Sequence, residues 1–251
     1  IAAKAGISPT KKFGQNFVID PGTVRRIVRE AGVTADDHVL EVGPGLGSLT
    51  LAILETGATM TAVEIDPPVA DLPDFQNDDS FTLVANLPYN VATPILLTLL
   101  ERFDNLGTFL VMVQKEVADR LSEKPGSKIY GAPSVKLAWY GTAERVGIIG
   151  RNVFWPAPNV DSALVLFKRY EGGHTPSANN PDGYVVDREN VFRLINAAFG
   201  QRRKTLHAAL KKIVPSEAFE QAGIDPTRRG ETLAIDEFVA LARAVGEVSQ
   251  A

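Results

Sequence analysis

The chain has 251 residues, enough for one large domain or for one domain with a small appendage. Its hydrophobic content of 45% is ordinary for a globular protein, and no apolar run approaches the roughly 20 residues that span a bilayer. The absence of cysteine excludes disulfides, thiolate catalysis and cysteine-based zinc sites. Three scattered histidines form no metal-ligand pattern and no signal peptide is visible, so we expect a cytoplasmic protein without a metal site.

The net charge of −4 at first argues against a nucleic-acid partner, but the charges are unevenly distributed. Residues 1–40 carry six Lys and Arg against four Asp and Glu, residues 187–251 carry ten against nine, and residues 41–186 carry ten against seventeen. Local basic clusters can contact phosphates, although a solvated helix face is the commoner explanation for any one pair. The clusters are Lys11-Lys12, Arg25-Arg26, Arg202-Arg203-Lys204, Lys211-Lys212 and Arg228-Arg229.

The first part of the chain alternates between strand and helix patterns. Asp20 as an N-cap and Pro21 in the first turn predict a helix that ends at Gly32. Short buried strands at 39–42 and 61–65 enclose a glycine-rich turn and a helix, which is the opening of a parallel α/β sheet. The patterns that follow predict a helix over 94–103, a strand over 109–113, a helix over 116–121, and late strands over 135–140 and 160–167.

The last part of the chain has a different composition. Residues 171–186 are rich in Gly, Pro, Asn and Ser and lack periodicity, which is typical of a linker. Helical patterns follow at 191–198, 206–213 and 235–245, with Asp236 as the expected cap of the last. We therefore predict a first domain over 1–172, a linker over 173–186 and a smaller all-helical domain over 187–251.

One connection is too short for the predicted fold. Only 22 positions separate Glu64 from Asn86, whereas a strand–helix–strand crossover takes roughly 30 residues. The intervening residues 71–80 are loop-like and contain no convincing strand. Either the natural chain is short here or a segment is absent from this sequence, and the crossover argument favours the second.

Glu41-Val42-Gly43-Pro44-Gly45-Leu46-Gly47 follows a predicted strand and opens a helix. Its glycines let a ligand approach the backbone, and its alternating spacing differs from the dinucleotide fingerprint, whose third glycine falls one place later. The form E-x-G-x-G-x-G is typical of S-adenosylmethionine sites. Glu64 ends the next strand, where a carboxylate can take both ribose hydroxyls. The alternative is a tight turn that binds no ligand.

A second polar motif, Asn86-Leu87-Pro88-Tyr89, ends a later apolar run. The Asn side chain and nearby backbone carbonyls can accept the N–H bonds of an exocyclic amine, and the Tyr can stack on a ring. The alternative is a strand that ends in a proline turn. In a doubly wound sheet this motif, the glycine loop and Glu64 meet at one edge, which implies a methyl donor beside a pocket for a base amine.

These motifs resemble the small-subunit ribosomal RNA adenine dimethyltransferase family, and the matches run nearly end to end. The resemblance implies a Rossmann-like, S-adenosyl-L-methionine-dependent methyltransferase domain with a helical C-terminal domain. The acidic residue with which the family contacts the cofactor's adenine falls between Ile65 and Phe81 and cannot be assigned here. The other matching segments are Phe13-Gly14-Gln15-Asn16-Phe17, 48–50, Val113-Gln114-Lys115-Glu116-Val117, 153–162, Gln201-Arg202-Arg203-Lys204-Thr205 and 228–233.

The resemblance also implies residue roles. Asn16 and Val18 lie over the cofactor, Gly43 contacts its methionine part, and Glu64 contacts its ribose. Gly45 also belongs to the cofactor site. Asn86 belongs to the cofactor site and also holds the target N6 amine. A carbonyl of the Leu87-Pro88 turn is the second acceptor, Tyr89 stacks on the base and Phe154 forms the opposite wall. The implied RNA contacts are Arg202, Arg203, Lys204, Arg228 and Arg229.

Simpler explanations exist for several of these residues. Asn16 can be a turn residue that precedes a helix, and Arg202-Arg203-Lys204 can be an exposed helix face. Phe154 and Trp155 can both be core aromatics, and for Trp155 we expect the core.

The sequence leaves three functional hypotheses. The first is a dimethyltransferase for two adjacent adenines near the 3′ end of small-subunit RNA, acting as a monomer on the assembling 30S subunit. The second is a large-subunit methyltransferase of the macrolide-resistance type, which residues 153–162 and 228–233 disfavour. The third is a non-catalytic RNA-binding assembly or transcription factor, which the intact Gly43, Glu64 and Asn86 disfavour. A DNA adenine methyltransferase fits less well, because such enzymes usually carry Asp or Asn before Pro-Pro-Tyr.

Overall fold

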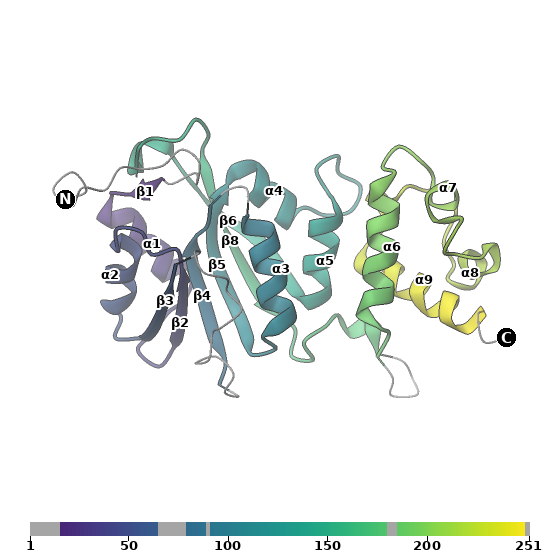
Figure 1. The fold of residues 1–251 in the computed structure, drawn as a ribbon, viewed down its shortest axis with the longest axis horizontal. Coiled ribbons are helices and arrows are strands. Elements are labelled where there is room, and N and C mark those ends of the chain that lie inside the picture. The colour runs from purple at the N-terminus through teal and green to yellow at the C-terminus, as the bar shows by residue number, and fades with distance from the viewer. Residues whose placement is uncertain (1–15, 65–78, 89–90, 180–184, 249–251) are drawn as a thin grey trace. The chain divides into compact units, whose positions relative to one another are not determined.

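The structure is a computed structural model that describes residues 16–64, 79–88, 91–179 and 185–248. The chain divides into two compact units (Figure 1). The first comprises residues 1–119 and 143–169, and the second comprises residues 120–142 and 170–251. The expected first domain, 1–172, thus contains a segment, 120–142, that clusters with the C-terminal residues, and the expected linker, 173–186, lies inside the second unit. Among the described residues, no helix has the length and apolarity to cross a membrane.

The first unit is built on a six-stranded sheet with the order β3-β2-β4-β5-β8-β6. Strand β2 pairs in parallel with β3 and β4, β4 pairs in parallel with β5, and β5 pairs antiparallel with β8. The predicted α/β class and Rossmann-like fold are therefore confirmed, in a mixed sheet whose strands β3, β2, β4 and β5 are parallel and whose β8 is antiparallel to β5. The strands are β2 (His38–Val42), β3 (Thr59–Val63), β4 (Phe81–Asn86), β5 (Leu106–Gln114), β6 (Gly141–Ile149) and β8 (Ser162–Arg169).

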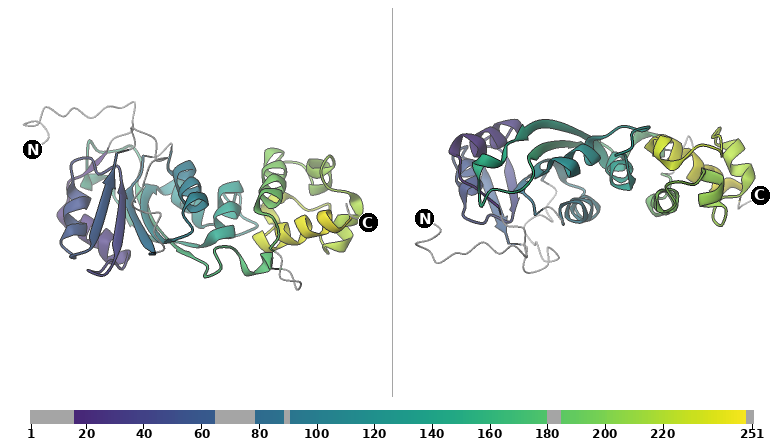
Figure 2. Two further views of the ribbon diagram at one scale, coloured as in Figure 1. Left: turned by 60° about the horizontal axis from the view of Figure 1, so that its bottom comes forward. Right: turned by 90° about the horizontal axis from the view of Figure 1, so that it is seen from above.

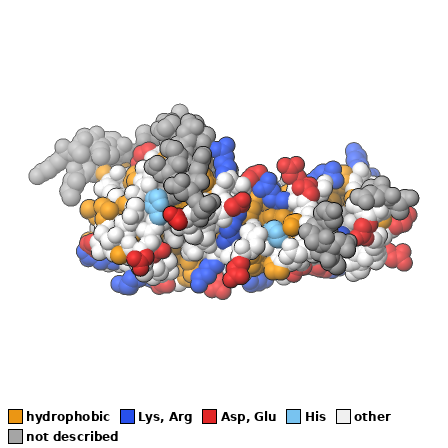
Figure 3. Space-filling model, turned by 90° about the horizontal axis from the view of Figure 1, so that it is seen from below, with side chains coloured by type: hydrophobic (Ala, Val, Ile, Leu, Met, Phe, Trp, Pro, Cys, Tyr) orange, Lys and Arg blue, Asp and Glu red, His pale blue; other side chains and the backbone are white. Residues whose placement is uncertain are grey.

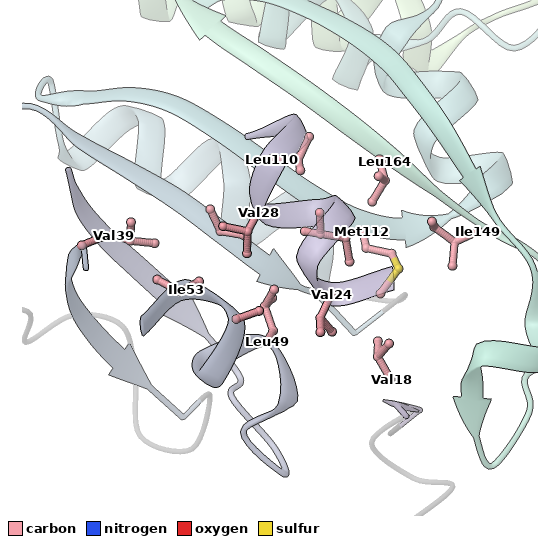
Figure 4. Packing of buried hydrophobic residues seen from close by; sticks show 14 of the residues in the cluster. Val18, Val24, Val28, Val39, Leu49, Ile53, Leu110, Met112, Ile149 and Leu164 are labelled. Atoms are coloured by element: carbon pink, nitrogen blue, oxygen red, sulfur yellow. The ribbon is translucent and has the colours of Figure 1, made fainter. Parts of the chain in front are cut away.

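Helices cover both faces of this sheet (Figure 2). Helix α1 (Pro21–Glu30) begins where the Asp20 side chain accepts from the Thr23 N–H, as the sequence predicts, and α2 (Ser48–Leu54) follows the glycine loop. Their apolar stripes pack with alternate residues of the central strands, among them Val84, Leu110 and Met112 (Figure 4). The first unit also contains α3 (Ala92–Arg102), the start of α4 (Lys115–Ser122), a 3-10 turn η4 (Arg151–Val153), and the strand pair β1 (Phe17–Val18) and β7 (Phe154–Trp155).

The second unit is helical in its described part. Its long helices α5 (Ala132–Tyr140), α6 (Arg188–Gly200) and α9 (Ile235–Val248) pack against one another, and the Tyr130 hydroxyl donates to the Leu233 carbonyl at 2.9 Å. Shorter elements complete it: η5 (Pro176–Ala178), α7 (Leu206–Leu210), α8 (Ser216–Gln221) and η6 (Gly230–Thr232). The predicted helical C-terminal part is confirmed.

Three details of the sequence prediction are wrong. Residues 135–140 belong to helix α5 and not to a strand, β6 was not predicted, and Asp236 lies in the first turn of α9 and does not cap it. Asp236 instead accepts hydrogen bonds from the hydroxyls of Ser177 and Thr175, at 2.6 and 3.2 Å. The Ala234 N–H, just before α9, is bound by the Glu237 carboxylate at 3.0 Å.

Candidate active site

The carboxyl ends of β3, β2 and β4 bring the predicted cofactor residues to one edge of the sheet. Gly43 follows β2, Glu64 follows β3, and Asn86 ends β4. The Gly43 N–H donates to the Val63 carbonyl at 2.8 Å, which joins the start of the glycine loop to the end of β3. Because β2 lies between β3 and β4, the chain order reverses here, and this is where open α/β sheets bind ligands.

The glycine loop needs its glycines for conformation and for space. Gly43, Gly45 and Gly47 have φ values of 73°, 55° and 78°, in the left-handed region that side chains disfavour. A Cβ on Gly45 would lie 2.9 Å from the Phe17 ring, so Phe17 packs directly on the loop. The Gly45 N–H donates to Glu64 Oε1 at 3.2 Å, which couples the loop to the predicted ribose ligand.

A buried carboxyl group lies under this loop. Glu41 is 1% exposed, and the Thr50 hydroxyl on α2 donates to its Oε2 at 2.6 Å. Burial raises the pKa of Glu41 to about 7; the Thr50 hydrogen bond opposes this rise and the charge of Glu64 adds to it. The sequence placed Glu41 in a predicted buried strand, but it did not indicate that Thr50 would hydrogen-bond to the carboxyl group.

These groups fit the S-adenosylmethionine that the motif predicts. The cofactor is a cation with an amino-acid tail, and two carboxyl groups, Glu41 and Glu64, lie close enough to affect each other's charge beside loop amides that can reach a ligand. The expected contacts of Glu64 with the ribose and of Gly43 with the methionine part stay predictions. The acidic residue expected to contact the adenine falls in residues 65–78, outside the described part of the chain.

The predicted amine site lies beside the loop. Asn86 Nδ2 donates to the backbone carbonyl of Asn16 at 3.1 Å, which sets the orientation of the amide and leaves Oδ1 as its acceptor. The Leu87 N–H donates to the Met112 carbonyl at 3.1 Å, and the Pro88 carbonyl accepts from the Ala92 N–H at 3.1 Å where α3 begins. The end of β4 is thus hydrogen-bonded both to β5 and to the start of α3. Tyr89 lies outside the described residues.

The strand pair β1–β7 brings the predicted N-terminal residues and Phe154 to the same site. Phe17 pairs with Trp155 and Val18 pairs with Phe154. Val18 and Phe154 are buried in the core cluster, Phe154 with 3% exposure, whereas Trp155 is 42% exposed. The expectation that Trp155 belongs to the core is wrong, because alternation along a strand turns neighbouring side chains to opposite faces. In this structure the Phe154 side chain packs in the core beneath the strand pair. Its role as a wall of the base pocket stays a prediction.

The predicted RNA-contacting residues in the second unit fall into two groups. Arg202 donates to Glu231 Oε2 at 3.1 Å, to the Tyr130 carbonyl at 2.9 Å and to the Lys128 carbonyl. Arg228 donates to the Thr232 carbonyl at 2.7 Å and pairs with Glu237, which raises the pKa of Arg228. These two side chains hold the unit's own backbone.

Arg203, Lys204 and Arg229 form the second group, and all three are exposed. Neighbouring exposed residues add His207, Lys211 and Lys212. Figure 3 shows acidic and basic side chains interspersed on one face of the molecule. Contact of these residues with phosphates stays a prediction.

A mixed sheet with this strand order, a glycine loop after β2 and an amide at the end of β4 define a Rossmann-like methyltransferase. The model of the family "Ribosomal RNA adenine dimethylase" matches residues 8–74 and 70–246. The chain belongs to this ribosomal RNA adenine dimethylase family, whose methyl donor is S-adenosyl-L-methionine.

Curated relatives agree with this assignment. The chain is 83% identical to the "Ribosomal RNA small subunit methyltransferase A" of Bifidobacterium adolescentis, covering 99% of this chain and 92% of the relative. It is 50% identical to the protein of the same name from Streptomyces griseus, covering 99% and 94%. A dimethyladenosine transferase from Plasmodium falciparum shares the fold, with a TM-score of 0.72 at 22% identity over 90% of this chain and 95% of that one.

The comparisons also bear on the short connection before β4. The alignment with the Bifidobacterium adolescentis protein extends over 279 positions, 28 more than the 251 residues of this chain. The two segments matched by the family model meet at residues 70–74, between Glu64 and Asn86. Relative to its family, this chain therefore lacks residues, and the break in the family match falls where the predicted crossover was too short.

Proposed function

We propose that this protein transfers methyl groups from S-adenosyl-L-methionine to the N6 amines of two adjacent adenines near the 3′ end of small-subunit ribosomal RNA. The main support for the proposal is the orientation of the Asn86 amide, which a hydrogen bond to the Asn16 carbonyl fixes beside the glycine loop. The names of the curated relatives favour the small subunit over the large one.

Asn86 and the turn after it can activate the target amine. An adenine amine is a poor nucleophile because its lone pair is delocalised into the ring. When bound, the cofactor supplies an electrophilic methyl group. Asn86 Oδ1 and a backbone carbonyl accept the two amine hydrogens, which favours a pyramidal nitrogen and stabilises the positive charge that develops on it.

The Leu87 carbonyl is the better candidate for the second acceptor. The Pro88 carbonyl already accepts from the N–H groups of Val91 and Ala92 at the start of α3. No ionised general base is needed in this account. The base must leave its stack to reach the site, where Tyr89 and Phe154 are the proposed walls. A second transfer follows when the monomethyl amine turns within the same pocket.

We place the protein in the cytoplasm, acting as a monomer on the assembling 30S subunit. Small-subunit RNA is the target in the names of the relatives, and the exposed Arg203, Lys204 and Arg229 supply positive charge for its phosphates. We expect a variant without activity, such as Asn86→Ala, still to bind the subunit, which would separate this role in assembly from methyl transfer.

Methyl transfer to under-methylated small subunits tests the proposal. We expect Asn86→Ala to lower kcat by roughly 100-fold or more, because an acceptor for the developing charge is lost, while cofactor binding changes little. Asn196→Ala removes the same group from an exposed position on α6 and serves as the control. Full activity of Asn86→Ala, or equal methylation of large subunits, would overturn the assignment.

A further inference from the structure

The strand pair β1–β7 presents two different faces. Directly opposite residues of an antiparallel pair lie on the same face, so Val18 and Phe154 share one face and Phe17 and Trp155 share the other. The first face is part of the core, and Figure 4 shows Val18 near Met112 and Ile149. The second face turns away from this core.

The second face borders the reaction site. The Phe17 ring packs on Gly45 of the cofactor loop, since a Cβ there would lie 2.9 Å from the ring. Asn16, the residue before Phe17, accepts the hydrogen bond that orients Asn86. Trp155 lies directly opposite Phe17 in the strand pair. It is therefore the neighbour of a residue that contacts the cofactor loop and that follows Asn16 of the amine site.

This face is apolar and open. Trp155 is 42% exposed, and Ile19, two residues after Phe17, is 57% exposed. The pairing continues past the two strands, because the Ile19 N–H donates to the Val153 carbonyl at 2.8 Å. This hydrogen bond fixes the position of Ile19 beside the strand pair. An exposed, fixed indole at the edge of a site is a flat surface on which a flat ligand can stack.

We propose that Trp155 stacks on the RNA base next to the target adenine and thereby holds the strand in register over the site. The proposal rests on the proposed function, since extrusion of one adenine deprives its neighbour of a stacking partner and leaves a flat base at this edge. Base–aromatic stacking is the usual means of holding unpaired strands. With two adjacent adenines as substrate, the neighbour in each round is the other adenine.

Kinetics on under-methylated small subunits test the role of Trp155. We expect Trp155→Ala to raise KM for the subunits about tenfold and to leave KM for S-adenosylmethionine unchanged, because one stacking contact to RNA is lost. Trp155→Phe keeps a ring and should retain most of the affinity. Leu54→Ala is the matched control, an equally exposed apolar residue (50%) at the far end of α2 from the loop. An unchanged KM for subunits in Trp155→Ala, or an equal loss in Trp155→Phe, would contradict stacking.

A binding measurement separates this proposal from the proposed function, because it requires no methyl transfer. The chain has two tryptophans, and the other, Trp139, is 4% exposed. A short single-stranded oligoadenylate should quench the fluorescence of the wild-type protein and leave that of Trp155→Phe unchanged. Absence of quenching at saturating RNA would reject the stacking role even if the enzyme is active. A dimer that forms without RNA and is lost in Trp155→Ala would assign this face to a second copy of the chain instead.

Discussion

Asn86 and Asn16 lie 70 positions apart in the sequence, and the hydrogen bond between them joins the amine site to the strand that covers the cofactor loop. The sequence predicted both residues for the site but not this bond, because local patterns carry no information on which distant groups meet. The acceptor is the backbone carbonyl of Asn16, so the bond does not require an Asn side chain at position 16. At the scale of single residues, the site depends on backbone position as much as on residue type.

Glu41 makes the stability of the first unit depend on pH. Its pKa rises from 4.5 in the unfolded chain to about 7 in the folded one, so the folded state holds a proton that the unfolded state has lost. The contribution is fully present below pH 4.5 and is lost as the pH rises through about 7. The difference amounts to a destabilisation on the order of 3 kcal/mol at pH 8.

Glu41→Gln tests this assignment, because it removes the ionisable group and keeps an oxygen that can accept from Thr50. We expect the variant to gain stability relative to the wild type between pH 5 and pH 8, measured as the free energy of unfolding in urea. An identical pH profile for the two proteins would show that Glu41 does not titrate in this range.

Among the elements, the strands and helices of the first unit before residue 120 could largely be predicted, because their apolar patterns are periodic and their turns carry glycine, whereas strand β6 was missed. Helix α5 could not be predicted. Its buried residues Val135, Leu137 and Trp139 alternate as in a strand, because the helix is buried on more than one side and has no single apolar stripe. The Ser134 hydroxyl, which accepts from the Gly131 N–H at 3.1 Å and donates to the Arg120 carbonyl, fixes its first turn.

The basic residues in the connections between the helices of the second unit have two different roles. Arg202 holds the carbonyls of Lys128 and Tyr130, so Arg202→Ala should lower the free energy of unfolding by about 2 kcal/mol, since charge-assisted bonds are lost. Arg203→Ala, at the exposed neighbouring position, should change it by less than about 0.5 kcal/mol. Thermal or urea unfolding of the full chain distinguishes the two.

Binding to small-subunit RNA should show the opposite pattern. Arg203→Ala, Lys204→Ala and Arg229→Ala should each weaken binding and reduce the slope of log affinity against log salt by about 1, because one phosphate contact is lost. Arg202→Ala, measured under conditions where it remains folded, should keep the slope. A slope that is unchanged in all three exposed variants would place the RNA contact elsewhere.

At the scale of the whole molecule, the chain has the family's two parts but a shorter connection before β4. The sequence alone indicated this, because 22 positions are too few for a crossover in a parallel sheet. The alignment contains at least 28 positions without a residue in this chain, and the family match breaks at residues 70–74; both support that interpretation. Which residue contacts the cofactor's adenine could not be predicted, because no candidate in this stretch has a matching context.

The shorter connection should weaken cofactor binding. We expect the dissociation constant for S-adenosylmethionine to be roughly tenfold higher than that of the Bifidobacterium adolescentis relative, because the family's contact to the adenine, about one hydrogen bond, falls in the stretch where this chain is shorter. Titration calorimetry on both proteins measures the difference. Inserting the relative's additional residues between Glu64 and Phe81 should restore the affinity, and equal affinities before the insertion would show that the segment does not contact the cofactor.

The central claim is dimethylation of two adjacent adenines of small-subunit RNA at the Asn86 site. Mass spectrometry of RNA from under-methylated small subunits, incubated with the protein and S-adenosylmethionine, measures it directly. We expect two adjacent N6,N6-dimethyladenines near the 3′ end with the wild-type protein and none with Asn86→Ala. Unmodified RNA with the wild-type protein, or methylation at other positions, would contradict it.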